Sequence, residues 1–419
     1  MALVVERGFA LALGGAALGA MAWSQLQLQR SPAPLGDESL ERLFAAAGEG
    51  AVPARMISGA LLGLLLGGVY LLVRRGRAAA AALGTALRRR PPGAGPSWLA
   101  LFLLGFGGMV LCEVLASAPL PRIVVVASRA GADEDQVETR RLSLARPLPV
   151  GGPAPAQESA PHLPLAGDEE APRALVRWLD MGPWLEVRPG ASPLRVGAGT
   201  PEPGQVVPLE LGAPVEVGPW TLRVEGPSPA QAMWHRTAGQ VLAAVLLLLG
   251  WRSVSRAGVT APTPLLRELL RGGRAWVGCL PLYVATLALT TALLHLLGLR
   301  AAGHPLVRAV EREGLVLLLP VAIQAALLAP IVEETVFRGL LLPGLQRPLG
   351  RPAGLFLSAV VFAAIHGGLA AALPMLVLGL LFGGLRETGP EGSLAAPIVA
   401  HALHNGVTLL LVGAILLLG

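Results

Sequence analysis

The most informative segment of the chain is LVLLLPVAIQAALLAPIVEETVFRGLLL, residues 315–342. Its length exceeds the roughly 17–25 apolar residues that a helix needs to cross a hydrocarbon core of about 30 Å. Two adjacent carboxylates, Glu333 and Glu334, and one guanidinium, Arg338, nevertheless lie inside it. Charged groups at membrane depth are costly, so those that persist usually face a bundle interior and have a function. We therefore expect a membrane helix that carries a site.

The whole chain has the composition of an integral membrane protein. Of its 419 residues 53% are hydrophobic and only 14% are charged, whereas soluble domains carry about 25% charged residues. A cytosolic globular enzyme is thereby excluded, and two cysteines are too few for a disulfide-stapled secreted domain. The net charge of +6 comes from arginine alone. We interpret it as a topology signal and expect no nucleic-acid partner.

Apolar runs predict a polytopic helix bundle of about eight or nine spans. The candidates are 7–24, 56–73, 98–116, 236–251, 276–299, 315–342, 354–371, 372–385 and 394–417. Arginines crowd the connections 74–90 and 252–274, which predicts that both face the cytoplasm. The absence of lysine and the Ala/Gly/Leu/Pro-rich composition suggest a GC-rich bacterial genome, so we expect a bacterial inner (plasma) membrane protein.

One stretch, residues 118–235, breaks the apolar pattern with short alternating strand-like runs between Pro/Gly turns. The predicted fold is therefore mainly α, with a small all-β domain inserted at 118–235. This domain separates N-terminal membrane helices (1–117) from a C-terminal membrane domain (236–419). The arginine distribution places the β domain outside the cytoplasm. It has no catalytic pattern and is expected to be structural or to bind an extracytoplasmic partner.

Two further polar clusters follow on later apolar stretches, namely Phe362-Ala-Ala-Ile-His366 and His401-Ala-Leu-His404-Asn405. Four-residue spacing predicts an ion pair between Glu334 and Arg338, and a shared helix face for His401 and Asn405. Glu333 lies about 100° round the helix from Glu334 and should point elsewhere. At about 1.5 Å per residue, all three clusters fall roughly 10–20 Å from the cytoplasmic face. We expect them to meet in one layer.

Such a layer has the groups needed for hydrolysis. A carboxylate and an imidazole that share a water can remove its proton. A second imidazole and a carboxamide can donate hydrogen bonds to an oxyanion. Since no Ser or Cys nucleophile lies in these clusters, activated water is the expected nucleophile.

Together the motifs Glu-Glu-x-x-x-Arg (333–338), Phe-x-x-x-His (362–366) and His-x-x-x-Asn (401–405) resemble the CPBP family. This is the CAAX prenyl protease type II and bacteriocin-processing (Abi) family of intramembrane proteases. The resemblance covers about residues 276–417. It implies that Glu333 and His366 activate water, that His401 and Asn405 line the oxyanion site, and that Glu334 and Arg338 organise the first helix. His404 has no role in the motif.

The resemblance favours a metal-independent glutamate mechanism with no required cofactor. A divalent metal such as zinc, held by the glutamate and two histidines, is the alternative. The expected function is that of an intramembrane endopeptidase that cleaves a membrane-bound protein or peptide. Prenylated CAAX substrates are not expected in a bacterium. The competing hypotheses are a non-catalytic scaffold or peptide-toxin immunity protein, and, last, a transporter with a proton relay.

Overall fold

The computed structural model describes most of the helical chain and the strands between the helices. Described are residues 11–12, 52–89, 98–117, 123–129, 137–141, 148–150, 163, 174–179, 182–187, 194–196, 199–202, 205–209, 211–217, 220–255, 264–297, 317–366, 368–390 and 393–418. Apart from residues 11–12, the predicted first span (7–24) lies outside this set. The described part is mostly helical, as predicted.

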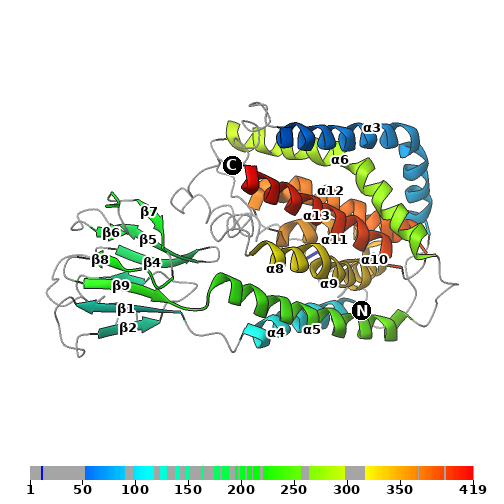
Figure 1. The fold of residues 1–419 in the computed structure, drawn as a ribbon. Helices are drawn as coiled ribbons and strands as arrows, with labels where there is room; N and C mark the ends of the chain where they lie inside the picture. Colours follow the sequence, from blue (N-terminus) through cyan, green and yellow to red (C-terminus); the bar gives the residue numbers. More distant parts are fainter. Residues whose placement is uncertain are drawn as a thin grey trace.

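Helices run side by side in one bundle (Figure 1). They are α3 (Val52–Leu87), α4 (Trp98–Ser117), α5 (Pro229–Ser255), α6 (Leu265–Leu296), α8 (Leu318–Ala322), η3 (Ile323–Leu328), α9 (Ala329–Glu334), η4 (Thr335–Leu341), α10 (Leu342–Leu349), α11 (Arg351–Ile365), α12 (Gly368–Thr388) and α13 (Ala395–Leu418). Among the described residues, four segments are long and apolar enough to cross a membrane by length and composition: Ala230–Gly250, Leu265–Leu296, Ala371–Thr388 and Ala395–Ala414. The protein is thus an integral membrane protein, while eight or nine spans stay a prediction.

The strands gather at one end of the bundle, where the C-terminal end of α13 also lies (Figure 1). They are β1 (Val124–Arg129), β2 (Val137–Arg141), β3 (Leu148–Val150), β4 (Ala174–Leu179), β5 (Gly182–Val187), β6 (Leu194–Val196), β7 (Val206–Pro208), β8 (Val215–Val217) and β9 (Trp220–Glu225). They form an antiparallel sheet of order β2-β1-β9-β8-β6 and another of order β3-β4-β5-β7. Alternate residues such as Val125, Leu222 and Val224 fill their core. That these strands are extracytoplasmic remains a prediction.

Residues 318–342 lie in one helical run, Leu318–Leu349, interrupted by two π-helical segments. In η3 the hydrogen bonds connect residues five apart, as from the Ala329 N–H to the Gln324 carbonyl. The next carbonyl, that of Ala325, would need an N–H at position 330, where proline has none. The Asn405 side chain of α13 donates to it instead, at 2.7 Å. A side chain of α13 thereby supplies the hydrogen-bond donor that the backbone of the other helical run lacks.

Helices α11 and α12 form a tight antiparallel pair. The sequence predicts spans that meet at 371/372, and this boundary is wrong, because α11 ends at Ile365 and α12 begins at Gly368. Glycines at 367 and 368 weaken the helix there, and the His366 ring caps the end of α11 by donating to the Phe362 carbonyl. Farther along, a Cβ on Gly379 would lie 2.9 Å from the Ala359 Cα. A small residue there allows the close approach expected of small-residue stripes.

Candidate active site

Glu333, His366 and His401 meet although three different helical segments supply them. Glu333 Oε2 lies 3.3 Å from His366 Nε2 and 4.0 Å from His401 Nε2. The side chains of Glu333 and His366 are each 23% exposed, whereas that of His401 is 4% exposed. The carboxylate and one imidazole can therefore contact water, while the second imidazole is almost sealed in the protein.

His366 has a defined protonation pattern in this arrangement. Its Nδ1 lies 2.7 Å from the Phe362 carbonyl, which can only accept a hydrogen bond, so Nδ1 carries a proton. In the neutral ring Nε2 is then a free acceptor, and it faces the Glu333 carboxylate. The 3.3 Å between Nε2 and Oε2 is within direct hydrogen-bond distance, so a doubly protonated ring donates to the carboxylate. In the neutral ring, both acceptors lie beside the same position for a water molecule.

Glu334 and Arg338 form the ion pair expected from their spacing, with Arg338 Nη1 3.0 Å from Glu334 Oε1. Both side chains are fully buried, at 0% and 1% exposed. The same carboxylate oxygen also accepts from His401 Nδ1 at 2.8 Å. Sequence spacing did not indicate this contact, which spans 67 positions. Glu334 therefore orients His401 so that Nε2 faces Glu333.

Aromatic rings enclose the buried arginine. The guanidinium carbon of Arg338 lies 4.2 Å from the ring centroid of Phe362 and 5.2 Å from that of Phe382. Its Nη2 also donates to the Gly379 carbonyl at 3.2 Å. A buried ion pair needs such additional partners to offset the cost of removing both charges from water.

Phe382 is a site residue that sequence reasoning missed. Its ring stacks on His401 with centroids 4.9 Å apart and an interplanar angle of 16°, and it is fully buried. It belongs to none of the three motifs. The one signal that could have pointed to it is that Phe382 is the only aromatic residue of α12.

Asn405 and His404 are placed differently from the other polar residues. Asn405 donates one of its two amide hydrogens to the Ala325 carbonyl. The second amide hydrogen has no acceptor among the described residues. Only this second hydrogen therefore remains to donate to an oxyanion, the role predicted for Asn405. The His404 ring packs edge-on against Tyr283 of α6, with centroids 4.8 Å apart, as a core histidine would.

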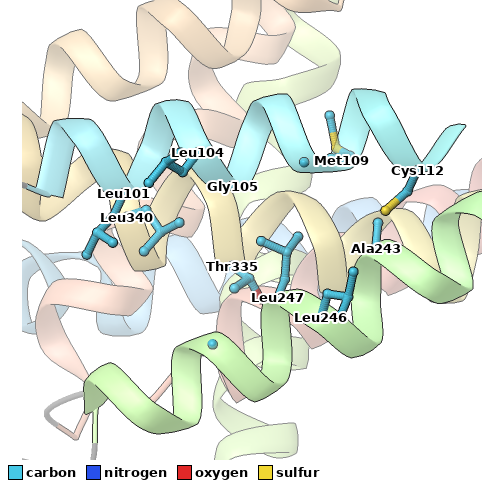
Figure 2. Close-up of a pocket in the computed structure, with 12 residues that line it drawn as sticks. Leu101, Leu104, Gly105, Met109, Cys112, Ala243, Leu246, Leu247, Thr335 and Leu340 are labelled. Atoms are coloured by element: carbon cyan, nitrogen blue, oxygen red, sulfur yellow. The ribbon is translucent and has the colours of Figure 1, made fainter. Parts of the chain in front are cut away.

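An apolar cavity of about 260 Å³ lies between α4, α5 and η4 (Figure 2). Leu101, Leu104, Met109, Leu246 and Leu340 are among its walls, and Thr335 adds a polar group from η4. None of the six predicted site residues lines it. The cavity thus borders a part of η4 that is separate from the Glu333 cluster.

A zinc ion would need Glu333, His366 and His401 as its donors. No group of three or more His, Cys, Asp or Glu in the described part of the chain is placed to hold a metal ion. Metal dependence stays a prediction for chelation to test.

Comparison with known proteins identifies the region that contains this site. Residues 315–407 match the family described as type II CAAX prenyl endopeptidase Rce1-like. No curated protein and no solved structure matches the chain significantly. The matched stretch runs from just before α8 into α13 and contains all six predicted site residues. Residues 315–407 of this chain are therefore similar to the type II CAAX prenyl endopeptidase Rce1-like family.

Proposed function

We propose that the protein is an intramembrane endopeptidase that hydrolyses a peptide bond of a membrane-associated protein or peptide. The observation that carries the proposal is the 3.3 Å approach of Glu333 to His366, with both side chains still partly accessible. A carboxylate and an imidazole in this relation can activate a water molecule. The family match supports peptidase activity in general.

In the proposed mechanism, a water molecule binds beside Glu333 Oε2 and His366 Nε2 and donates a hydrogen to the Glu333 carboxylate. Glu333 takes one proton as the water oxygen attacks the scissile carbonyl carbon. The carbonyl π electrons move to oxygen, which becomes the oxyanion of a tetrahedral intermediate. When the C–N bond breaks, Glu333 returns the proton to the leaving amine nitrogen, so the carboxylate is restored.

The oxyanion requires hydrogen-bond donors on the opposite side. His401 Nε2 is one candidate, and it donates when the ring carries both protons, a form whose Nδ1–H is held by the Glu334 carboxylate. The second amide hydrogen of Asn405 is the other. Because both groups are fixed before substrate binds, little reorganisation is needed during the reaction.

The test compares membranes from cells that produce wild-type protein or Glu333→Gln. We expect an uncut precursor to accumulate with Glu333→Gln and with His366→Ala, because loss of a general base costs about 10²–10⁴-fold in rate. Glu216→Gln is the matched control, since Glu216 lies in β8 and pairs with Arg195, at the strand end of the molecule. Cleavage that persists in both site variants, with all proteins inserted equally, would reject the assignment.

Metal dependence is measured on the same purified protein. A mechanism that uses only protein side chains predicts that a chelator such as EDTA leaves cleavage unchanged. Loss of cleavage that is restored by zinc would instead support the metal alternative.

A second candidate function is a non-catalytic membrane scaffold or peptide-toxin immunity protein. It is favoured by the strands, which form their own core and lie outside the matched family region. In that case deletions within 118–235 should abolish function, while Glu333→Gln should retain it. The peptidase proposal predicts the opposite response to Glu333→Gln.

A further inference from the structure

Helix α3 is longer than a membrane crossing requires. Its 36 residues would extend about 54 Å, against a hydrocarbon core of about 30 Å. Its first part packs along α6, where a Cβ on Gly68 would lie 2.7 Å from Pro281 Cδ. Farther on, Leu83 reaches the end of α12, with its Cδ1 3.7 Å from a Cβ placed on Gly384. Figure 1 shows the helix turning across the end of the bundle that is opposite the strands.

Where α3 changes direction, its exposed side chains change from apolar residues to arginines. Leu62, Leu66 and Val69 expose apolar side chains, as expected of a lipid-facing helix. At the next turn the Arg74 guanidinium donates to the Tyr70 hydroxyl and lies 5.6 Å from the centroid of the Tyr70 ring. Tyrosine and arginine anchor helices where hydrocarbon meets headgroups. Residues 75–89, here called the arm, therefore begin at that boundary.

The arm has two different faces. Toward the bundle, Leu83, Ala86 and Leu87 are buried or half-buried. Away from it, the alanines at 78–82 are exposed, as are four arginines: Arg75, Arg77, Arg88 and Arg89. Residues 52–89 contain no Asp or Glu, and these four guanidinium groups pair with no carboxylate of the described residues. Within the described part of the chain, the arm thus presents four exposed arginines that have no carboxylate partner.

Two other arginines of the helices already have carboxylate partners. Arg271 binds the Glu268 carboxylate at 2.7 Å and the Leu385 carbonyl at 3.0 Å. Arg351 forms an ion pair with Glu387. The exposed positive charge at this end of the bundle therefore includes the arm, together with Arg267 and Arg274 of α6.

We propose that the arm lies in the headgroup layer of the bilayer and binds anionic phospholipid headgroups through Arg75, Arg77, Arg88 and Arg89. Guanidinium groups bind phosphate oxygens in pairs, which suits them to this partner. The small alanines between them let the helix lie close to the lipid surface. Because its start is fixed in the hydrocarbon by the first half of α3, the arm cannot leave the surface. This inference does not depend on the protease assignment.

The first experiment measures where the arm lies. A spin label is attached at Ala81→Cys in full-length protein whose native thiols are removed by Cys112→Ala and Cys279→Ala. The protein is reconstituted in vesicles of phosphatidylcholine alone or mixed with phosphatidylglycerol. We expect the label in mixed vesicles to be protected from a water-soluble nickel relaxant. Full accessibility to nickel in both vesicle types would overturn the proposal.

The second experiment measures headgroup selectivity with matched double variants. Phosphatidylglycerol binding to detergent-purified protein is compared for Arg88→Gln/Arg89→Gln and for Arg195→Gln/Arg223→Gln, which alters exposed arginines of the strands. Each arm arginine should contribute about fivefold in affinity, so the first pair should lose about 30-fold and the second pair nothing. Added salt should reduce the difference. Equal losses in both pairs, or equal binding of phosphatidylcholine and phosphatidylglycerol, would contradict the proposal.

Discussion

At the scale of single residues, two neighbouring glutamates have opposite environments. Glu333 is partly exposed and faces two imidazole Nε2 atoms. Glu334 is sealed between Arg338 and His401. A shift of one position along the helix turns a carboxylate by about 100°, which is enough to separate a carboxylate that faces two imidazoles from one held in a buried ion pair.

The two glutamates should therefore respond differently to the same substitution. Glu334→Gln leaves the Arg338 charge buried without its counter-ion, so we expect the free energy of unfolding to fall by about 3–5 kcal/mol. Glu333→Gln should abolish cleavage and change stability by less than about 1 kcal/mol. Thermal unfolding in detergent, measured beside the cleavage assay, distinguishes them. Equal destabilisation would show that the two environments are not distinct.

Phe382→Leu should reduce kcat with little effect on KM. Loss of the stack on His401 removes an aromatic contact of about 0.5–1.5 kcal/mol, which corresponds to roughly a two- to tenfold change in rate. Phe356→Leu is the control, because Phe356 is 55% exposed on α11. The positioning role fails if the two substitutions have the same kinetic effect, or if Phe382→Leu changes only KM.

At the scale of secondary-structure elements, the helical run from α8 to α10 lacks one backbone hydrogen bond, and a side chain of another helix replaces it. Proline at 330 leaves the Ala325 carbonyl without a backbone donor, and Asn405 of α13 supplies one. Buried carbonyl groups that lack a donor are costly, so this contact fixes α13 against the segment that carries Glu333.

Pro330→Ala should restore a backbone N–H and make the Asn405 contact redundant. We expect Asn405→Ala to cost about 1–3 kcal/mol in the wild-type background and clearly less in the Pro330→Ala background. Pro320→Ala serves as the control, since Pro320 lies in the first turn of α8, where a missing N–H is tolerated. Additive effects in the double variant would mean that the two residues are not coupled.

Helix α12 can approach α11 only through glycine. Gly379→Ala places a Cβ 2.9 Å from Ala359 and disturbs the carbonyl that binds Arg338, so a loss of about 1–3 kcal/mol is expected. Gly406→Ala is a matched change on α13, where the nearest atom beyond its own helix is 3.9 Å away. It should be neutral or slightly stabilising. The same unfolding temperature for both variants would contradict close packing at Gly379.

At the scale of the whole molecule, the strands are joined to the bundle at one place. They connect the end of α4 to the start of α5, and these two ends lie together, since His235 Nδ1 donates to the Ala116 carbonyl at 2.7 Å. The buried core of the strands contains no helical residue. The helices and the strands therefore have separate cores.

Replacement of residues 119–227 by a short Gly/Ser linker should leave the helix bundle folded. We expect the variant to insert in membranes and to keep the helical circular dichroism of the bundle, because the linker only has to join two adjacent helix ends. Loss of the folded bundle, measured by unfolding in detergent, would show that the strands stabilise it.

The sequence by itself determined what depends on composition and on spacing within one helix. These features are the membrane character, the order of the three polar motifs and the Glu334–Arg338 pair, because side chains four apart on one helix always share a face. Tertiary structure alone decided that His401 binds Glu334, that Phe382 stacks on His401 and that Asn405 reaches Ala325. These contacts join different helices, so they depend on how closely and at what angle the helices pack, which the period of a single helix does not encode.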